Sequence, residues 1–244
     1  MPIAFVIGGA RRLGRSISLR LASEGYDVGI SYFSSEQHAR TLATEVLELD
    51  RRFASVRCDV RDEDELHATW RALCQALGQP DVVVLCAGVF PDPQQPETLT
   101  SEHLINVMRV NSLPLLSIAA NYALDCRASQ TTGRLISIGS LGATEIWKDR
   151  LLYNTSKGAA RTIALSLARS MAPTLSVNIV APGAISQPND SSKTDQYLIA
   201  PERIPMLRHG TDVDVCDAVM FFAQASHYIT GQTISVDGGY GLTR

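Results

Sequence analysis

The sequence has few of the residues that build disulfide-linked, metal-binding or membrane-spanning proteins. Its five cysteines are odd in number and include no C-x-x-C pair, and its five histidines show no ligand spacing. We therefore expect neither a disulfide framework nor a metal site. No apolar run approaches the roughly eighteen residues that cross a bilayer, and the amino terminus has no basic region followed by a cleavage site. A cytoplasmic protein with no membrane partner is the expectation.

An excess of charge of one sign is also lacking. The formal net charge is −3 over 244 residues, and the densest basic cluster consists of Arg11, Arg12 and Arg15. Nucleic acids and anionic membranes are bound by concentrated Lys and Arg. Three charges suit a pocket rather than such a surface, so we expect a small-molecule substrate and no nucleic acid.

Short apolar runs alternate with helical patterns along the whole chain. With 45% hydrophobic and 19% charged residues, the composition is that of an ordinary globular protein. Buried strands are predicted at residues 3–7, 28–32, 53–58, 81–86, 134–139, 176–181 and 232–236, with helices between them. This alternation predicts the α/β fold class, with a single Rossmann-type, doubly wound parallel sheet of about seven strands and helices on both faces. We expect one domain over residues 1–244, with a polar substrate lid at about 186–210.

The first strand leads directly into a glycine-rich turn, Gly8-Gly-Ala-Arg-Arg-Leu-Gly14, and then into a helical pattern. Such a turn lets the backbone approach a pyrophosphate, which binds the N–H groups and the positive dipole end of the helix. The residues expected to bind a dinucleotide here are Gly8, Arg11, Arg12, Leu13 and Gly14. Because a glycine turn alone is a weak signal, a simple chain reversal is the alternative.

The end of the second strand is where dinucleotide folds distinguish NAD from NADP. Its residues are Tyr32, Phe33, Ser34 and Ser35. The hydroxyl groups, together with Arg11 and Arg12, leave room for a 2′-phosphate and favour NADP(H). Glu36 keeps NAD(H) possible, since a shift of one residue in the strand end would bring its carboxylate to the ribose.

Two spacings point to a catalytic centre. Tyr153 and Lys157 are four residues apart in a segment predicted to be helical over 149–171, so they lie on one face of the helix. A phenol has a pKa of about 10, and a neighbouring ammonium is expected to lower it. Ser140 ends a strand-like run, at the edge where open α/β sheets bind ligands. We therefore expect Ser140 to polarise a substrate carbonyl that Tyr153 protonates, although a Y-x-x-x-K motif alone usually marks a surface pair.

Three further residues have two interpretations each. Asp59, just past the third strand, either accepts a hydrogen bond from an adenine amino group or is an ordinary loop residue. Phe90, in a proline-rich loop after the fourth strand, either stacks on a flat substrate or provides apolar cover. Asn111 lies between apolar residues of a helix predicted over 102–124. Since a buried amide without partners costs about 1–3 kcal/mol, Asn111 is either a structural hydrogen-bonding residue or part of a proton relay.

Over essentially its whole length the chain resembles the short-chain dehydrogenase/reductase family of single-domain enzymes. The matching pieces are the Gly8–Gly14 turn, Asp59-Val60, Ala87-Gly88, Asn111, Ser140, Tyr153-Asn-Thr-Ser-Lys157, Pro182-Gly183 and Asp237-Gly-Gly239. The resemblance implies that Tyr153 is the general acid, that Lys157 contacts the tyrosine and the nicotinamide ribose, and that Ser140 orients the carbonyl. It also implies a relay water held by Asn111 and a homotetramer or homodimer. The cofactor-binding positions that it adds are Asp59, Val60, Ala87, Gly88, Pro182, Gly183 and Ile185.

Within the family, three features resemble the pteridine reductases: the run Arg11-Arg-Leu-Gly-Arg15, Phe90, and the tail Asp237-Gly-Gly-Tyr-Gly-Leu-Thr-Arg244. In that subgroup the arginine matching Arg12 lies at the cofactor and substrate, a phenylalanine stacks on the pterin, and the tail approaches a neighbouring subunit's site. Ser140 instead resembles the 3-oxoacyl-carrier-protein reductases, because pteridine reductases carry an aspartate there.

Two positions depart from the common family pattern: Arg12 replaces a glycine and Cys86 replaces an asparagine. The prediction is an NADPH-dependent oxidoreductase with Tyr153 as proton donor. Its hydride acceptor is the carbonyl of a small ketone or 3-oxoacyl thioester, or a pterin-type C=N bond. The alternative is a non-catalytic sensor or scaffold that binds NADP(H).

Overall fold

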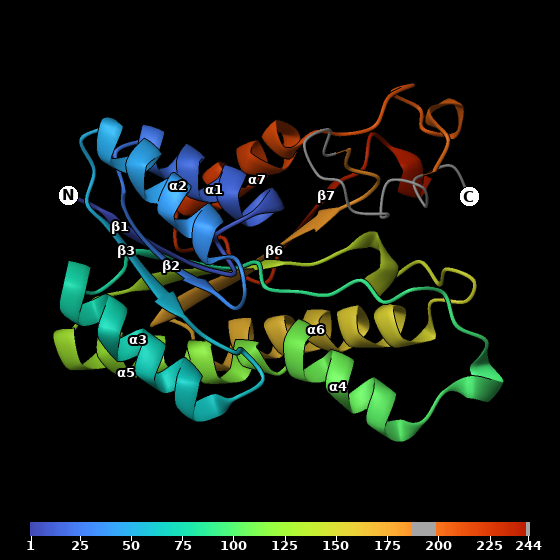
Figure 1. Cartoon of the computed structure of the whole chain (residues 1–244), viewed down its shortest axis with the longest axis horizontal. Coiled ribbons are helices and arrows are strands. Elements are labelled where there is room, and N and C mark those ends of the chain that lie inside the picture. The colour runs from blue at the N-terminus through green and yellow to red at the C-terminus, as the bar shows by residue number, and fades with distance from the viewer. Residues whose placement is uncertain (187–198, 243–244) are drawn as a thin grey trace.

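Seven parallel strands form a single sheet in the order β3-β2-β1-β4-β5-β6-β7 (Figure 1). The structure, a computed structural model, describes residues 1–186 and 199–242 of the chain. The strands are β1 (Ile3–Ile7), β2 (Asp27–Tyr32), β3 (Phe53–Arg57), β4 (Val82–Leu85), β5 (Gly133–Ile138), β6 (Leu175–Pro182) and β7 (Thr233–Val236). The predicted fold class is confirmed, and each predicted strand lies within one residue of its expected bounds.

Helices cover both faces of the sheet (Figure 1). One face carries α1 (Arg12–Ser23), α2 (Glu36–Glu48) and α7 (Asp212–Gln224). The other face carries α3 (Glu63–Leu77), α4 (Ser101–Asn111), α5 (Pro114–Ser129) and α6 (Leu151–Ser170). Cover on both sides explains why the central strands are continuous apolar runs rather than alternating ones. In β1, for example, every residue is buried.

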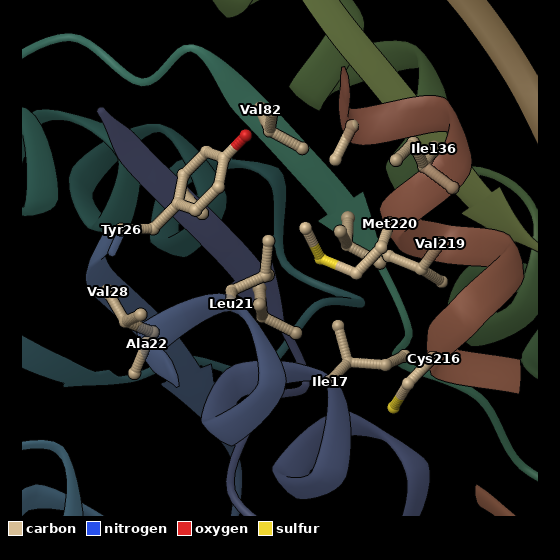
Figure 2. Close-up of a cluster of buried hydrophobic side chains, with 14 of the residues drawn as sticks. Ile17, Leu21, Ala22, Tyr26, Val28, Val82, Ile136, Cys216, Val219 and Met220 are labelled. Carbon is tan, nitrogen blue, oxygen red and sulfur yellow. The ribbon is translucent and has the colours of Figure 1, made fainter. Parts of the chain in front are cut away.

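Two apolar cores lie between the sheet and its helix layers. In the first, side chains of α1 and α7 meet over the strands (Figure 2). Its members include Ile17, Leu21, Val82, Ile136, Val219 and Met220. In the second, Trp70 packs edge-on against Phe5 at a centroid distance of 5.6 Å, and Tyr122 lies next to the same indole. Burying one large apolar side chain contributes roughly 1.5–3 kcal/mol, so these cores hold the helices firmly on the sheet.

The single helix predicted over 102–124 is wrong, because two helices occupy this segment. One, α4, ends at Asn111, and the next, α5, begins at Pro114. Proline has no N–H to donate, and its ring clashes with the carbonyl four residues earlier, so it is tolerated at the start of a helix and not inside one. The break leaves Asn111 buried at the end of α4, in hydrogen-bond contact with the loop that follows β4.

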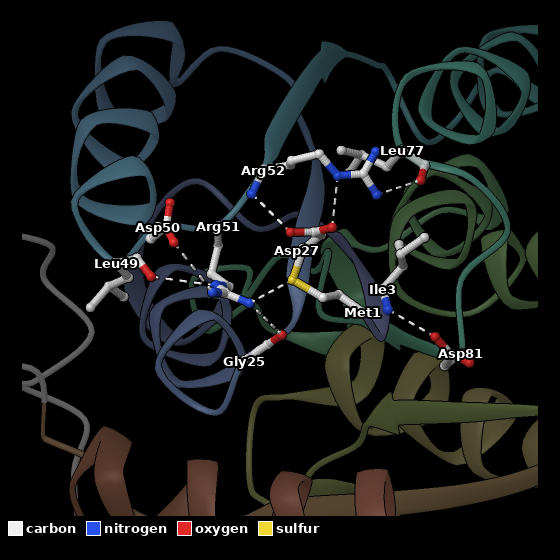
Figure 3. Close-up of polar contacts among 10 residues, drawn as sticks. All are labelled: Met1, Ile3, Gly25, Asp27, Leu49, Asp50, Arg51, Arg52, Leu77 and Asp81. Atoms are coloured by element: carbon white, nitrogen blue, oxygen red, sulfur yellow. Dashed lines mark hydrogen bonds and ion pairs between the residues drawn. The ribbon is translucent and has the colours of Figure 1, made fainter.

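Polar contacts join the amino-terminal ends of the strands (Figure 3). The carboxylate of Asp27 is fully buried and accepts hydrogen bonds from the backbone N–H and the guanidinium of Arg52, each at 2.8 Å. The carboxylate of Asp81 accepts a hydrogen bond from the Ile3 N–H, also at 2.8 Å. These contacts hold β1 and β2 beside the segments that precede β3 and β4, at the edge of the sheet away from the expected ligand side.

About half of the predicted lid at about 186–210, residues 187–198, lies outside the described residues. Its flanks are described and pair with each other. The Ser186 N–H donates to the Gly210 carbonyl oxygen at 2.9 Å, and the Gly210 N–H donates to the Ala184 carbonyl oxygen at 2.9 Å. Both flanks therefore lie side by side just past the carboxyl end of β6.

Over residues 1–186 and 199–242, no helix is long and apolar enough to cross a membrane. All five cysteines are free. Within that described part of the chain, no group of three or more His, Cys, Asp or Glu side chains is placed to hold a metal ion.

Candidate active site

A cleft of about 810 Å³ runs along the carboxyl-terminal edge of the sheet. The predicted cofactor-binding residues that line it are Gly8, Arg11, Arg12, Leu13, Gly14, Tyr32, Phe33, Ser34, Ser35, Asp59, Val60, Ala87, Gly88, Pro182, Gly183 and Ile185. The predicted catalytic and substrate-binding residues that line it are Ser140, Tyr153, Lys157 and Phe90. Of all the predicted site residues, Asn111 alone does not line the cleft, and its neighbour Val110 does.

The glycines of the first turn are required by close backbone contacts. Gly8 has a φ of +84°, and a Cβ there would lie 2.7 Å from the backbone of Ala87. A Cβ at Gly14 would lie 2.1 Å from the carbonyl oxygen of Gly8. Arg12, which replaces a glycine of the common family pattern, has a φ of +53°. This left-handed conformation costs a residue with a side chain roughly 1–2 kcal/mol. Arg12 therefore has a strained backbone conformation that a glycine would adopt without that cost.

Ser140 and Lys157 are held by backbone groups around the end of β5. Ser140 is buried at the start of a 3-10 turn, η2 (Leu141–Ala143), and its hydroxyl accepts a hydrogen bond from the Gly142 N–H at 3.1 Å. The Lys157 ammonium donates to the Ile138 carbonyl oxygen at 2.9 Å. Burial lowers the pKa of Lys157 to about 8. The charge of this side chain is therefore sensitive to pH just above neutrality.

Tyr153 lies on α6, and its phenol is hydrogen-bonded to Ser140. Burial raises the pKa of Tyr153, while the hydrogen bond with Ser140 and the charges of Arg150 and Arg12 lower it. The net shift is upward, so the expectation of a lowered pKa is wrong. The physical reason is that desolvation of the phenol outweighs the nearby charges, and the ammonium of Lys157 is directed to a backbone carbonyl. A phenol with a raised pKa keeps its proton at neutral pH and can donate it.

The Asn111 side chain is joined to the loop after β4. Its amide nitrogen donates to the Val89 carbonyl oxygen at 3.0 Å and to the Ser156 hydroxyl at 2.9 Å. Its amide oxygen accepts a hydrogen bond from the Val89 N–H at 2.7 Å. The structural interpretation of Asn111 is confirmed, and its part in a proton relay stays a prediction.

Aromatic rings surround the phenol of Tyr153. Phe90 lies edge-on to Tyr153 at a centroid distance of 4.5 Å, and Trp147 stacks on Tyr153 at 5.9 Å. The guanidinium carbon of Arg150 lies 4.1 Å from the centroid of the Phe90 ring. Sequence reasoning missed Trp147 and Arg150. The available signal was their place between Ser140 and Tyr153, because a short segment that joins two site residues has to pass beside the site.

Arginines gather around Phe33 at the other end of the cleft. The guanidinium carbons of Arg57 and Arg61 lie 5.3 and 5.4 Å from the Phe33 ring centroid. Arg57 is level with Tyr32 in the pairing of β2 with β3, so its position follows from the sheet register. Arg11 and Arg61 line the cleft. Positive charge is therefore concentrated at this end, and sequence reasoning had found only the part of it contributed by the first turn.

The acidic residues nearest this end have arginine partners. The carboxylate of Asp59 accepts hydrogen bonds from the Arg61 guanidinium at 2.5 to 3.0 Å, and these bonds lower the pKa of Asp59. Glu36 pairs with Arg40 at 2.6 Å and is not among the residues that line the cleft. This pairing weakens the case for Glu36 as a ribose-binding residue. The adenine contact of Asp59 stays a prediction.

The carboxyl-terminal tail reaches the same cleft. Tyr240 is buried, packs with Leu141 and Ile204, and lines the cleft of its own chain. The approach of the tail to a neighbouring subunit's site, which the resemblance to pteridine reductases implies, stays a prediction. The last two residues of that tail, Thr243 and Arg244, lie outside the described residues.

The sheet order, the glycine turn after β1 and the group of Ser140, Tyr153 and Lys157 define an oxidoreductase of the dinucleotide-binding α/β class. A family model described as enoyl-(acyl carrier protein) reductase matches residues 8–241. The chain belongs to the short-chain dehydrogenase/reductase family, whose members bind a nicotinamide cofactor.

Similar proteins support the same family. The 3-oxoacyl-(acyl-carrier-protein) reductase FabG of Staphylococcus aureus is 30% identical, over 97% of this chain and 96% of its own length. The crystal structure of acetoin dehydrogenase from Enterobacter cloacae is 25% identical with a TM-score of 0.90, over 100% of this chain and 97% of that one. A variant of actinorhodin polyketide ketoreductase, solved with NADPH, is 25% identical with a TM-score of 0.88, over 98% and 97% of the two chains.

Proposed function

We propose that this chain is an NADPH-dependent reductase that converts a carbonyl group to an alcohol, with Tyr153 as the proton donor. The observation that carries the proposal is the convergence of Ser140, Tyr153 and Lys157 in a cleft whose other end holds arginines. A reductase of this kind needs a proton donor beside the reacting carbon and positive charge where the 2′-phosphate of the cofactor would bind.

The residues of the cleft fit a phosphorylated dinucleotide. At Gly8 and Gly14 the chain packs too closely for a side chain, and both glycines line the cleft beside the amino-terminal end of α1, where backbone N–H groups suit a pyrophosphate. Arg11 and Arg61, with the hydroxyl of Ser34, would hold a 2′-phosphate. When bound, NADPH would supply the hydride.

The chain's own residues polarise the carbonyl and move the proton. The Ser140 hydroxyl would donate a hydrogen bond to the substrate oxygen, which polarises the carbonyl. The phenol of Tyr153, whose pKa burial raises, then gives its proton to that oxygen as the alcohol forms. The O–H bond of the phenol breaks, the O–H bond of the product forms, and solvent returns a proton to the phenolate. Lys157, which is charged at pH values below about 8, would contact the nicotinamide ribose of the bound cofactor.

A 3-oxoacyl thioester or a small ketone is the first candidate substrate. The names of similar proteins include 3-oxoacyl-(acyl-carrier-protein) reductases, an acetoin dehydrogenase and a polyketide ketoreductase. A pterin-type substrate is the second candidate. It is favoured by Phe90, which lies 4.5 Å from the ring of Tyr153, and by Arg12, which lines the same cleft.

The test is NADPH oxidation by the purified protein with acetoacetyl-coenzyme A, diacetyl and dihydrobiopterin in parallel, repeated with NADH. We expect turnover of a carbonyl substrate with NADPH. The Tyr153→Phe variant removes only the hydroxyl, so it should abolish turnover and leave NADPH affinity nearly unchanged. Turnover that survives this change would refute the mechanism. Turnover of dihydrobiopterin alone would select the second candidate, and NADPH binding without turnover of any substrate would favour the sensor or scaffold.

The same proposal includes a substrate lid and an oligomeric state. The segment 186–210, whose flanks meet at Ala184 and Gly210 beside the cleft, would act as a substrate lid. The chain would assemble as a homotetramer or homodimer, which light scattering of the purified protein would test.

A further inference from the structure

Arg150 is a buried charged residue at the start of the helix that carries Tyr153. Only 7% of its surface is exposed, and it occupies the amino-terminal cap position of α6. Both features are unfavourable for a cation, because burial removes its water and the helix dipole is positive at this end. A cation is kept in such a place only where its surroundings compensate it, so its contacts indicate what it does.

The contacts of Arg150 join the start of α6 to the loop that follows β4. Its Cζ lies 4.1 Å from the centroid of the Phe90 ring, and its Nη1 donates a hydrogen bond to the Pro91 carbonyl oxygen. A guanidinium over an aromatic face is attracted by the ring quadrupole. The preceding residue, Asp149, accepts a hydrogen bond from the Gln94 N–H at 3.1 Å through its carbonyl oxygen. The loop is thus attached to the helix at two adjacent residues.

Phe90 in turn packs on the phenol of Tyr153. The two ring centroids are 4.5 Å apart and the ring planes are inclined by 89°. Arg150, Phe90 and Tyr153 therefore form a closed group, with two members on one turn of α6 and the third on the loop. Burial raises the pKa of Tyr153, and the charge of Arg150 is one of the effects that lower it.

We propose that Arg150 is a positioning residue of the reductase site, which holds Phe90 against Tyr153 and adds a positive charge beside the phenol. This role rests on the proposed function of Tyr153 as proton donor. After the proton has left, the charge of Arg150 stabilises the phenolate. Without Arg150, Phe90 loses the partner on its ring face and the loop loses one of its two contacts with the start of α6, so the substrate end of the cleft is less well formed.

Other ionisable groups line the cleft near the phenol and bear on its titration. They are Arg12, Cys86, Lys148, Asp149, Lys157 and Tyr240. Burial raises the pKa of Cys86 to about 11, so this thiol is neutral at neutral pH. Burial lowers the pKa of Lys157 to about 8. Because all six groups are unchanged in an Arg150 variant, a difference in the titration of Tyr153 reports on Arg150.

Two variants separate the charge from the contact. Arg150→Met keeps an unbranched stem and removes the charge and the donors, whereas Arg150→Lys keeps the charge and loses the planar group over Phe90. Arg169→Met, which changes an exposed arginine near the other end of α6, is the matched control. The ionisation of Tyr153 is followed by tyrosinate absorbance, as the titration step that the Tyr153→Phe variant lacks.

In Arg150→Met we expect this titration step to move upward by about one pH unit, since an opposite charge nearby shifts a pKa by about one to three units. We also expect a severalfold higher KM for the substrate that the wild-type protein turns over. Arg150→Lys should restore the titration step and keep the higher KM, and Arg169→Met should match the wild type in both.

An unmoved titration step in Arg150→Met would overturn the role of the charge, and an unmoved KM in both Arg150 variants would overturn the positioning of Phe90. Persistent turnover in Tyr153→Phe would refute the proposed function instead, and the titration does not depend on turnover. If Arg150→Met does not fold, the proposal is tested with Arg150→Lys alone. A KM equal to that of the wild type in Arg150→Lys would then overturn the proposal.

Discussion

The side chain of Asn111 and the backbone of Val89 form a reciprocal pair. The amide donates to the Val89 carbonyl oxygen at 3.0 Å and accepts from the Val89 N–H at 2.7 Å. Only a side chain with a donor and an acceptor at this spacing can satisfy both backbone groups. The pair therefore ties the break between α4 and α5 to the loop that carries Phe90, next to the phenol of Tyr153.

Replacing Asn111 by alanine is expected to lower the free energy of unfolding by about 1–3 kcal/mol, because both backbone groups of Val89 lose their partner. Turnover should fall as well, since the loop that carries Phe90 is released. Urea unfolding and NADPH oxidation measure the two effects. Asn106→Ala is the matched control, an exposed asparagine of the same helix whose amide oxygen accepts a 3.4 Å hydrogen bond from Arg109. Equal stability of the two variants would contradict the structural role of Asn111.

Replacing Arg12 by glycine is expected to stabilise the fold and weaken cofactor binding. At a φ of +53° a glycine avoids the side-chain clash of the left-handed region. It also adds freedom to the unfolded chain, so the net gain is about 0.5–1 kcal/mol. This corresponds to roughly 1–4 °C in Tm for a chain of this size, which differential scanning calorimetry can resolve.

Arg11→Gly is the control for Arg12→Gly, because Arg11 has a φ of −146°, where glycine brings no relief. Titration of both variants with NADPH measures the effect of the lost charge. A Tm of Arg12→Gly at or below that of the wild type would show that the backbone at this position is not strained.

Replacing Arg61 by alanine is expected to reduce the preference for NADPH over NADH. Arg61 lines the cleft beside Phe33, where the 2′-phosphate would bind. Loss of one charge-assisted contact of about 1.4 kcal/mol would raise the KM for NADPH about tenfold. The KM for NADH should change little, because NADH has no such phosphate. Arg40→Ala removes an exposed arginine paired with Glu36 and is the control. An equal rise in the KM for NADPH and for NADH would show that Arg61 does not recognise the 2′-phosphate.

Replacing Arg52 by methionine is expected to weaken a pH dependence of stability. Burial raises the pKa of Asp27, but the hydrogen bonds from Arg52 hold it below its ordinary value. A carboxyl whose pKa in the folded state lies below its unfolded value of about 3.9 stabilises the fold above that pH. The contribution is lost as the pH falls through the folded pKa. In Arg52→Met the guanidinium is lost while burial and the backbone N–H bond remain, so the pKa of Asp27 in the folded state should rise from its wild-type value.

The free energy of unfolding of Arg52→Met should therefore fall further behind the wild type as the pH rises from about 2 to about 6. Urea unfolding at several pH values measures this difference. In a pair of proteins that both carry Asp27→Asn, the effect of Arg52→Met should not depend on pH in this range. A constant difference between Arg52→Met and the wild type would contradict the linkage to Asp27.

The sequence alone was sufficient for the sheet and for most of the cleft. Apolar runs such as Ile3–Ile7 mark strands buried on both faces, and parallel strands bring their carboxyl ends to one edge. Residues that follow different strands, such as Gly8, Asp59 and Ser140, therefore lie along the same edge of the sheet once the strands are recognised. The break in the helix predicted over 102–124 was also encoded locally, in Pro114, and was overlooked.

Only the tertiary structure decided how the side chains around the phenol affect one another. The pKa of Tyr153 is set by burial, which raises it, and by the charges of Arg12 and Arg150, which lower it. Arg57 and Arg61 meet at Phe33 because β2 and β3 pair in one particular register. Periodicity and motif spacing describe neighbours along one element. Burial and the distances between charges are set by packing between elements, and for that reason they could be read only from the folded chain.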